Sequence, residues 1–233
     1  MKLAAVSLRA TAAAVALFAV SAAHADLTIP FAWTESNSVQ TFTQDNLDSF
    51  DLVHLSVVAK GNASAKGEPV NGGSGSVNYQ SYSFPITKIV IGSNLSIKSG
   101  QAAGSALYFD RTDDDTGLVY GLTLANFTID YAAQKVLADI TPKGGTTATQ
   151  QHLYTFEVDT KLALKYKFPL TVTGHEVLKN LRLSQGAQDA LNSALLLPEI
   201  AQDALKFDYG TLTQDVSTNL RKKSISSALY VAK

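Results

Sequence analysis

Hydrophobic and polar residues alternate along most of the chain, with the period of two that is typical of β-strands. The longest such run lies between residues 154 and 172. Because alternation places apolar side chains on one face of a sheet, we predict two half-buried antiparallel strands here, turning near Asp159 and Thr160. The apolar members, all at even positions, are Tyr154, Phe156, Val158, Leu162, Leu164, Tyr166, Phe168, Leu170 and Val172.

Other segments carry the same pattern. Alternate apolar residues from Leu27 to Trp33 predict a first strand, and Pro30 suits a sheet edge because it lacks a backbone N–H. The segments 86–91 and 95–97 predict a hairpin. Between residues 118 and 131 the apolar residues move from even to odd positions, which predicts a β-bulge.

Short helices are predicted where a capping residue precedes apolar residues at helical spacing. Thr43 would cap a helix that buries Leu47 and Phe50, and Ser184 would cap a second one. Pro198 would lie in the first turn of a third helix. This third helix would carry into the core Ile200, Ala201, Ala204 and Leu205.

Strand patterns then resume from Phe207 to Thr213 and over roughly the last 15 residues. The chain combines many strands with few helices and shows no regular alternation of strand and helix. We therefore predict a mainly β fold, an antiparallel β-sandwich or a small closed barrel, with two or three short helices.

The start of the chain has the features of a removable export signal. Lys2 and Arg9 supply positive charge, and small residues precede position 26. The apolar stretch from Ala10 to Val20 spans about 16 Å as a helix, well short of the roughly 30 Å core of a bilayer. We expect residues 1–25 to be a signal peptide and residues 26–233 a single domain in the periplasm or the medium, with no membrane span left after cleavage.

Composition excludes several classes of protein. Hydrophobic residues make up 45% of the chain and charged residues 17%, which excludes a disordered, charge-rich chain. The absence of cysteine excludes disulfides, thiolate zinc sites and a cysteine nucleophile. Loss of Lys2 and Arg9 with the signal would leave 17 basic and 20 acidic residues, a net charge of −3. Because the only basic cluster, Arg221 to Lys223, fits an exposed turn or a solvated edge, we expect no nucleic-acid partner.

The acidic segment from Asp110 to Gly117 is the strongest candidate for a metal site. Ca²⁺ takes six to eight oxygen ligands, and Asp113 and Asp115 followed by glycine fit part of such a loop. The bidentate acid and flanking helices of an EF-hand are missing. We therefore favour a hairpin turn whose aspartates accept backbone N–H bonds, with calcium as the alternative.

Catalytic motifs are not recognisable. His175-Glu176 begins like a zinc-protease helix, but Lys179 stands where the second histidine is required. His54 and His152 are distant in sequence, so a three-histidine site would need convergence in space. A Gly-x-Ser-x-Gly elbow and a phosphate-binding loop are also missing from the sequence. We expect a protein without catalytic activity, and a hydrolase with unconventional residues stays an alternative.

Aromatic and asparagine residues offer two further observations. Tyr79 and Tyr82, next to a Gly/Ser-rich loop, are the aromatic residues with the least core-like positions, so they are the candidates for binding a ligand such as a glycan. Asn62, Asn94 and Asn126 each begin an Asn-x-Ser/Thr triplet. Because the alanine-rich start is typical of bacterial signals, we interpret these triplets as chance occurrences.

Several strings of residues resemble a group of exported, β-rich proteobacterial proteins without known activity. The resemblance implies an exported single domain and supplies no site residues. The strings are Leu124–Tyr131, Val136–Asp139, Leu162–Leu170, Gly174–Leu178 and Tyr209–Asp215.

We therefore expect an envelope or extracellular module that binds a partner protein, a glycan or a surface, or contributes to a matrix. The alternative is a structural subunit that assembles by edge pairing of the strand from Leu27 to Trp33. Both hypotheses leave the oligomeric state open.

Overall fold

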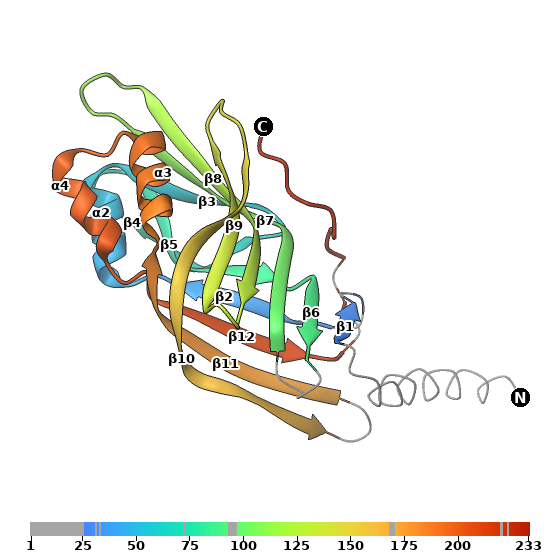
Figure 1. The fold of residues 1–233 in the computed structure, drawn as a ribbon. Helices are drawn as coiled ribbons and strands as arrows, with labels where there is room; N and C mark the ends of the chain where they lie inside the picture. Colours follow the sequence, from blue (N-terminus) through green and yellow to red (C-terminus); the bar gives the residue numbers. More distant parts are fainter. Residues whose placement is uncertain are drawn as a thin grey trace, which may run out of the picture.

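A single antiparallel sheet curls into a half-barrel, and the helices gather at one end of it (Figure 1). The computed structural model describes residues 26–30, 32, 34–71, 73–92, 97–167, 171–219, 221–222 and 224–233. Strands make up 56% of the structure and helices 15%, so the predicted mainly β fold with short helices is confirmed.

The sheet has 12 strands in the order β1-β6-β7-β8-β9-β10-β11-β12-β2-β5-β4. β3 pairs with β7 outside this path, on residues Ser105–Arg111, whereas β6 pairs with residues Ile97–Gln101 of the same long strand. The strands are β1 (Leu27–Pro30), β2 (Asn37–Thr41), β3 (Leu55–Gly61), β4 (Ser64–Asn71), β5 (Val77–Pro85), β6 (Lys88–Ile91), β7 (Ile97–Thr112), β8 (Val119–Asp130), β9 (Lys135–Pro142), β10 (Ala148–Lys167), β11 (Thr171–Leu183) and β12 (Thr211–Ser217).

The predicted edge strand and hairpin are both present. β1 lies at one end of the sheet, as Pro30 indicated, and β6 and β7 pair antiparallel. Phe31 and Trp33 of the predicted first strand lie outside the described residues, and so do residues 93–96 of the hairpin.

The helices are α2 (Gln44–Leu52), α3 (Gln185–Leu195) and α4 (Glu199–Gln202), followed by the 3₁₀ helix η3 (Asp203–Lys206). Both predicted caps form, because the hydroxyl groups of Thr43 and Ser184 each accept a hydrogen bond, at 3.2 Å, from the N–H three residues on. The side chains of Leu47 and Phe50 are buried as predicted.

The inner face of the half-barrel and the helices enclose a hydrophobic core. The Phe42 ring lies at its centre, with its centroid 5.4 Å from that of Phe50, 5.9 Å from Tyr82 and 6.4 Å from Tyr209, all edge-to-face. Within the described parts of the chain, no helix is long and apolar enough to span a bilayer.

The prediction for β10 is wrong in one respect. We expected a turn near Asp159 and Thr160, but β10 continues through both residues as one strand. Its pairing with β11 shifts register between residues 158 and 163, so this part of the strand contains bulges instead of a turn. Asp159 forms an ion pair with Lys179 of β11 at 2.7 Å. The connection to β11 lies at residues 168–170, outside the described residues.

Two predictions for the last part of the chain also need correction. Ile200 is 77% exposed because α4 makes only one turn before η3 begins, although Ala201 and Leu205 are buried as predicted. The strand expected over roughly the last 15 residues is wrong, since the residues described after Ser217 contain no strand.

The predicted bulge in β8 is confirmed. Its pairing with β9 shifts register between Ala125 and Thr128, and Asn126 adopts a φ of 55°. Apolar side chains on both sides of the shift, Leu124 and Ile129, are buried. The bulge therefore leaves the core intact and re-aims the side chain of Asn126.

Candidate functional site

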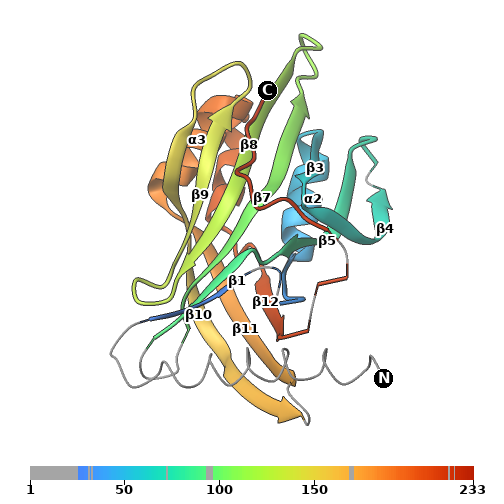
Figure 2. The same cartoon turned by 90° about the vertical axis from the view of Figure 1, so that its right-hand side faces the viewer.

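The segment 226–233 crosses the sheet on the face opposite α3, passing over β7 and β8 (Figure 2). It forms neither strand nor helix. Side chains from the end of β3 and from β8 hold it at Ser226 and Tyr230 by hydrogen bonds to its backbone. We call the residues beneath it, Gly61, Asn62, Gly104 and Asn126, the outer groove.

Asn126 holds the peptide groups of Tyr230. Its Oδ1 accepts the Tyr230 N–H at 2.8 Å and the Gly104 N–H at 3.0 Å. Its Nδ2 donates to the Tyr230 carbonyl at 3.0 Å and to Asp139 Oδ2 at 2.7 Å. An amide has two donors and two acceptor sites, so every hydrogen-bonding position of this buried side chain is used.

Asn62 makes the same kind of contact four residues earlier in the segment. Its Nδ2 donates to the Ser226 carbonyl at 2.7 Å, and its Oδ1 accepts the Ser226 N–H at 3.1 Å. Nδ2 also donates to Ala103 O at 3.0 Å, which fixes the side chain against β7. The two asparagines thus contact the backbone of the segment on either side of a bend at Ala228, and these hydrogen bonds do not involve its side chains.

Residues with positive φ are aligned across four elements beneath the segment. They are Gly61 at the end of β3, Gly104 in β7, Asn126 in β8 and Gln150 in β10, with φ values of 62°, 76°, 55° and 48°. Each of the last three lies at a register shift of its strand. The bulge at Asn126 turns its side chain toward the segment, whereas the N–H of Gly104 and the side chain of Gln150 form hydrogen bonds with Asn126.

Two of these positions have no room for a side chain. A Cβ atom on Gly104 would lie 2.7 Å from Asn62 Nδ2 and 2.8 Å from Ala228 O. On Gly61 it would lie 2.0 Å from Gly104 O and 2.9 Å from the ring of Tyr230. The close approach of β7 requires glycine at position 61, and the close approach of Asn62 and of the segment requires glycine at position 104.

Asp139 in β9 supports the groove from beneath. Its Oδ1 accepts hydrogen bonds from the backbone N–H of Gln150 at 2.8 Å and from Gln150 Nε2 at 3.1 Å, while Oδ2 accepts from Asn126. Gln150 Nε2 also donates to the Asn126 carbonyl at 2.8 Å. Because Asp139 can only accept, it holds the amide of Asn126 with Nδ2 toward β9 and Oδ1 toward Gly104 and Tyr230.

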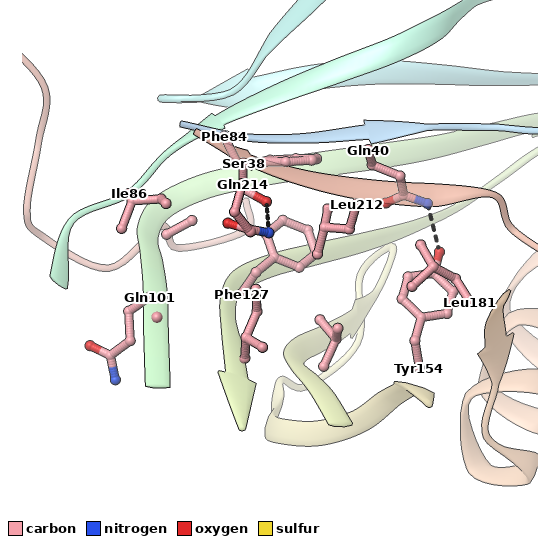
Figure 3. A pocket seen from close by; sticks show the side chains of 14 residues that line it. Ser38, Gln40, Phe84, Ile86, Gln101, Phe127, Tyr154, Leu181, Leu212 and Gln214 are labelled. Atoms are coloured by element: carbon pink, nitrogen blue, oxygen red, sulfur yellow. Dashed lines mark hydrogen bonds between the residues drawn. The ribbon is translucent and has the colours of Figure 1, made fainter. Parts of the chain in front are cut away.

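The interior of the half-barrel contains a second polar region (Figure 3). Gln40 Nε2 donates to the Tyr154 hydroxyl at 3.3 Å, and Gln214 Nε2 donates to Ser38 Oγ at 2.8 Å. These residues line a largely apolar cavity of about 30 Å³, room for about one water molecule. A cavity of this size does not accommodate a substrate.

Glu176 of β11 is buried on the same sheet, and its Oε2 accepts a hydrogen bond from the Tyr131 hydroxyl at 2.5 Å. Desolvation raises the pKa of the Glu176 carboxyl, although the hydrogen bonds from Tyr131 and from the Leu162 N–H act in the opposite direction. Burial also raises the pKa of the Tyr131 hydroxyl.

A larger groove of about 350 Å³ lies between the ends of β8 and β9 and α3. Its ionisable lining side chains are Tyr120 and Lys143, and Lys143 Nζ donates to Val119 O at 3.0 Å. Among the described residues that line it there is no carboxylate or histidine, so the groove offers no acid–base pair. The remaining lining residues are Gly121, Pro142, Ala190, Ser193 and Ala194.

The acidic segment considered for calcium forms the hairpin turn between β7 and β8. Asp113 Oδ1 accepts hydrogen bonds from the N–H and hydroxyl of Thr116 at 3.0 and 2.7 Å, and Gly117 adopts a φ of 66°. The Asp115 side chain is exposed in the same turn. Calcium at Asp113 and Asp115 stays the untested alternative to this turn.

Tyr79 and Tyr82 do not form an exposed aromatic platform. Tyr82 is fully buried, its hydroxyl donates to Val57 O at 2.8 Å, and burial raises its pKa to about 12. The ring of Tyr79 packs against it edge-on, with centroids 6.1 Å apart. Both residues lie close to a polar loop in the sequence, but strand β5 carries Tyr82 into the core.

The three histidines lie apart. His54 contacts Asp114 at 2.6 Å in the turn beside β7, and His175 contacts Asp215 at 2.8 Å across β11 and β12. His152 lies on β10. Over the ranges that the structure describes, no three His, Asp or Glu residues gather in a way that could hold a metal ion.

The sequence did not predict that Asn62 and Asn126 hold another segment, because their Asn-x-Ser/Thr triplets indicate only glycosylation. The change of phase in β8 did mark the position of Asn126 as irregular. Its contact with Tyr230 joins residues 104 positions apart and leaves no local pattern.

The fold and the outer groove together define a mainly β module that holds an irregular peptide segment on its outer face. No protein-family model matches the chain, and no curated protein matches it significantly. Among solved structures, the C-terminal domain of HtaA from Corynebacterium glutamicum is similar, with a TM-score of 0.47, 12% sequence identity, and coverage of 79% of this chain and 97% of that one. This distant similarity carries no argument about function.

Proposed function

We propose that the protein is an exported, non-catalytic module that binds a peptide segment of a partner protein in the outer groove. The observation that carries this proposal is the paired use of Asn62 and Asn126, each of which holds both the N–H and the C=O of one residue. Backbone recognition gives affinity for a peptide chain, and the close contact of the Tyr230 ring with Gly61 supports a preference for an aromatic side chain at that position.

The chemistry of the groove supports binding rather than catalysis. Its polar side chains are amides, which neither ionise near neutral pH nor act as nucleophiles. The export expected from residues 1–25 and the resemblance to exported β-rich proteins support a partner in the envelope or the medium. We favour a peptide segment of an envelope or extracellular protein over a glycan. Glycan binding by ring-face stacking requires exposed aromatic side chains, and the four residues of the outer groove include none.

The segment 226–233 occupies the groove in the isolated chain, so a partner must displace it. A segment tethered this closely competes with an effective concentration on the millimolar scale. Binding of the partner and release of the segment are therefore coupled.

A full-length S226P/Y230P variant separates the groove from its own segment. Proline removes the two N–H groups that Asn62 and Asn126 accept, whereas the groove itself is unchanged. We expect a fluorescently labelled peptide of residues 224–233 to bind this variant saturably, measured by fluorescence polarisation. Absence of saturable binding at millimolar variant would contradict the proposal.

Two further substitutions in the same background control this titration. Asn126→Ala removes one of the two contacts and should weaken peptide binding at least about tenfold. Asn192→Ala, on α3 at the opposite face, should leave the affinity unchanged. Partner sequences can then be selected from displayed decapeptides on the S226P/Y230P variant, and peptides that bind equally well after Asn126→Ala do not use the groove.

The position of β1 favours a second candidate function, a structural subunit. β1 is the last strand at one end of the sheet, where another chain could add a strand. Removal of residues 26–30 should then abolish assembly in size-exclusion chromatography. An unchanged elution profile would contradict it.

A further inference from the structure

We infer that the segment 226–233 is exchanged between two copies of the chain, so that the outer groove of each copy holds the segment of the other. This inference rests on the proposed function of the groove and names a second copy as the partner. It follows from how the chain is fixed before the segment, how the segment itself is held, and how short the connection between them is.

The chain is fixed to the body of the protein at Arg221. The guanidinium Nη2 donates to Ser36 O at 3.2 Å and to Ile86 O at 2.9 Å, and the backbone N–H donates to Ala32 O at 3.4 Å. The sequence predicted an exposed turn or a solvated edge for this basic cluster. Lys222 is exposed, whereas Arg221 is half-buried beside Ser36 and Ile86, and Lys223 lies outside the described residues. Arg221 therefore marks the point up to which the chain belongs to the body.

Beyond this point the segment is attached by a different kind of contact. It does not pair as a strand, and its described hydrogen bonds to the body are those with Asn62 and Asn126. The side chains of Leu229 and Val231 are 65% and 75% exposed. Because these two side chains are already mostly exposed, release of the segment transfers little of their apolar area to water. The segment can therefore leave the groove without opening the core.

A second copy offers a groove with the same asparagines and glycines. Exchange therefore replaces each contact by an identical one, and concentration decides between the two states. The outward side chains of Leu229 and Val231 favour the exchanged state, because a second body facing the segment would cover this apolar pair.

The connection sets the shape of the exchanged form. Five residue steps separate Arg221 from Ser226, a span of at most about 18 Å when fully extended. The described residues of this connection form neither strand nor helix. The two bodies must therefore lie in contact, and reciprocal exchange produces a closed two-fold dimer.

Two complementary full-length variants test the exchange. N62A/N126A has a disabled groove and an intact segment, whereas S226P/Y230P has an intact groove and a disabled segment. Neither variant can hold its own segment in its own groove. Two copies of the same variant also lack the combination of an intact groove and an intact segment. Only the mixture brings an intact segment together with an intact groove.

We expect the mixture to form a 1:1 heterodimer in sedimentation velocity and native mass spectrometry, at concentrations at least about tenfold below those at which either variant self-associates. Equal association of the separate variants would show that another surface is responsible and would overturn the exchange. Circular dichroism verifies folding of each variant. If N62A/N126A unfolds, N62A replaces it; this variant keeps the Asn126 contacts with Tyr230, so the mixture is then expected to associate at a concentration below that of N62A alone by a smaller factor, and equal association would still overturn the exchange.

The peptide of residues 224–233 distinguishes failure of the exchange from failure of the groove. If the mixture stays monomeric at about millimolar concentration while S226P/Y230P binds the peptide, the groove binds peptides and the exchange is wrong. If the mixture stays monomeric and the peptide does not bind, the proposed function fails as well.

Discussion

The side-chain amide of Asn126 and the main-chain amide of Tyr230 form a reciprocal pair, with Nδ2···O at 3.0 Å and N···Oδ1 at 2.8 Å. This pair connects a bulge in the middle of the sheet with a segment 104 residues further along the chain. In a regular strand, the backbone N–H and C=O groups pair in the ladder and the side chains alternate between the two faces of the sheet. The bulge interrupts this alternation and aims the side-chain amide of Asn126, all of whose hydrogen-bonding positions are occupied, at the backbone of another segment.

Substitution of Asn126 should destabilise the fold and release the segment. Asn126→Ala removes four hydrogen bonds, two to Tyr230 and one each to Asp139 and Gly104, so we expect a loss of about 2–3 kcal/mol in the free energy of unfolding. Urea denaturation measures this loss. Asn192→Ala is the matched control, expected within about 0.5 kcal/mol of the unmodified chain, and equal stability of the two variants would show that Asn126 has no special role.

Glycine in the groove should not tolerate a methyl group. Gly104→Ala introduces a Cβ 2.8 Å from Ala228 O at a φ of 76°, so we expect a loss of about 1–3 kcal/mol and easier proteolysis within the segment 226–233. Gly100→Ala, in the same strand with no atom within 4 Å of the new Cβ, is the control. Similar proteolysis of both variants would contradict the close approach of the segment.

Burial of Glu176 predicts a pH dependence of stability. Because its pKa is raised in the folded state above the value of 4.5 for an unperturbed carboxyl, its contribution to stability is complete below that value and is lost as the pH rises through the folded pKa. Glu176→Gln cannot ionise, so it should gain stability relative to the unmodified chain between about pH 4 and pH 8. Urea midpoints at both pH values measure the difference, and a difference that is independent of pH would refute the assignment.

Calcium should not stabilise the protein through the β7–β8 turn. The hydrogen bonds from Thr116, and further the charge of Arg111, lower the pKa of the Asp113 carboxyl. Because an ion would have to compete with these partners, we expect the melting temperature in millimolar Ca²⁺ to equal that in EDTA. A higher melting temperature in Ca²⁺ that is lost in Asp113→Asn would restore the calcium hypothesis.

Local signals in the sequence were sufficient for most of the fold. Alternation predicts a mainly β chain, and the caps at Thr43 and Ser184 predict the starts of two helices, because these features depend on residues within a few positions of one another. The change of phase in β8 located the bulge at Asn126 for the same reason. The turn expected at Asp159 failed because bulging and a contact with Lys179 keep the strand intact, and this depends on a neighbouring strand.

The groove could not be predicted in the same way. It requires bulges in separate strands to align, and the register that aligns Gly104 with Asn126 and Gln150 is set by pairing across the whole sheet. The segment that fills it resembles a strand in sequence, but no sheet edge receives it within the described structure. Tyr82 shows the converse, since a residue beside a polar loop proved to be part of the core.

Residue-resolved amide hydrogen exchange by NMR tests the central claim most directly. In the unmodified chain, the amides of Ser226 and Tyr230 should exchange at least about tenfold more slowly than those of Ser227 and Val231, and Asn126→Ala should abolish the protection of Tyr230. Equal exchange rates at all four positions would show that the asparagines do not hold the segment, and would contradict the peptide-binding groove.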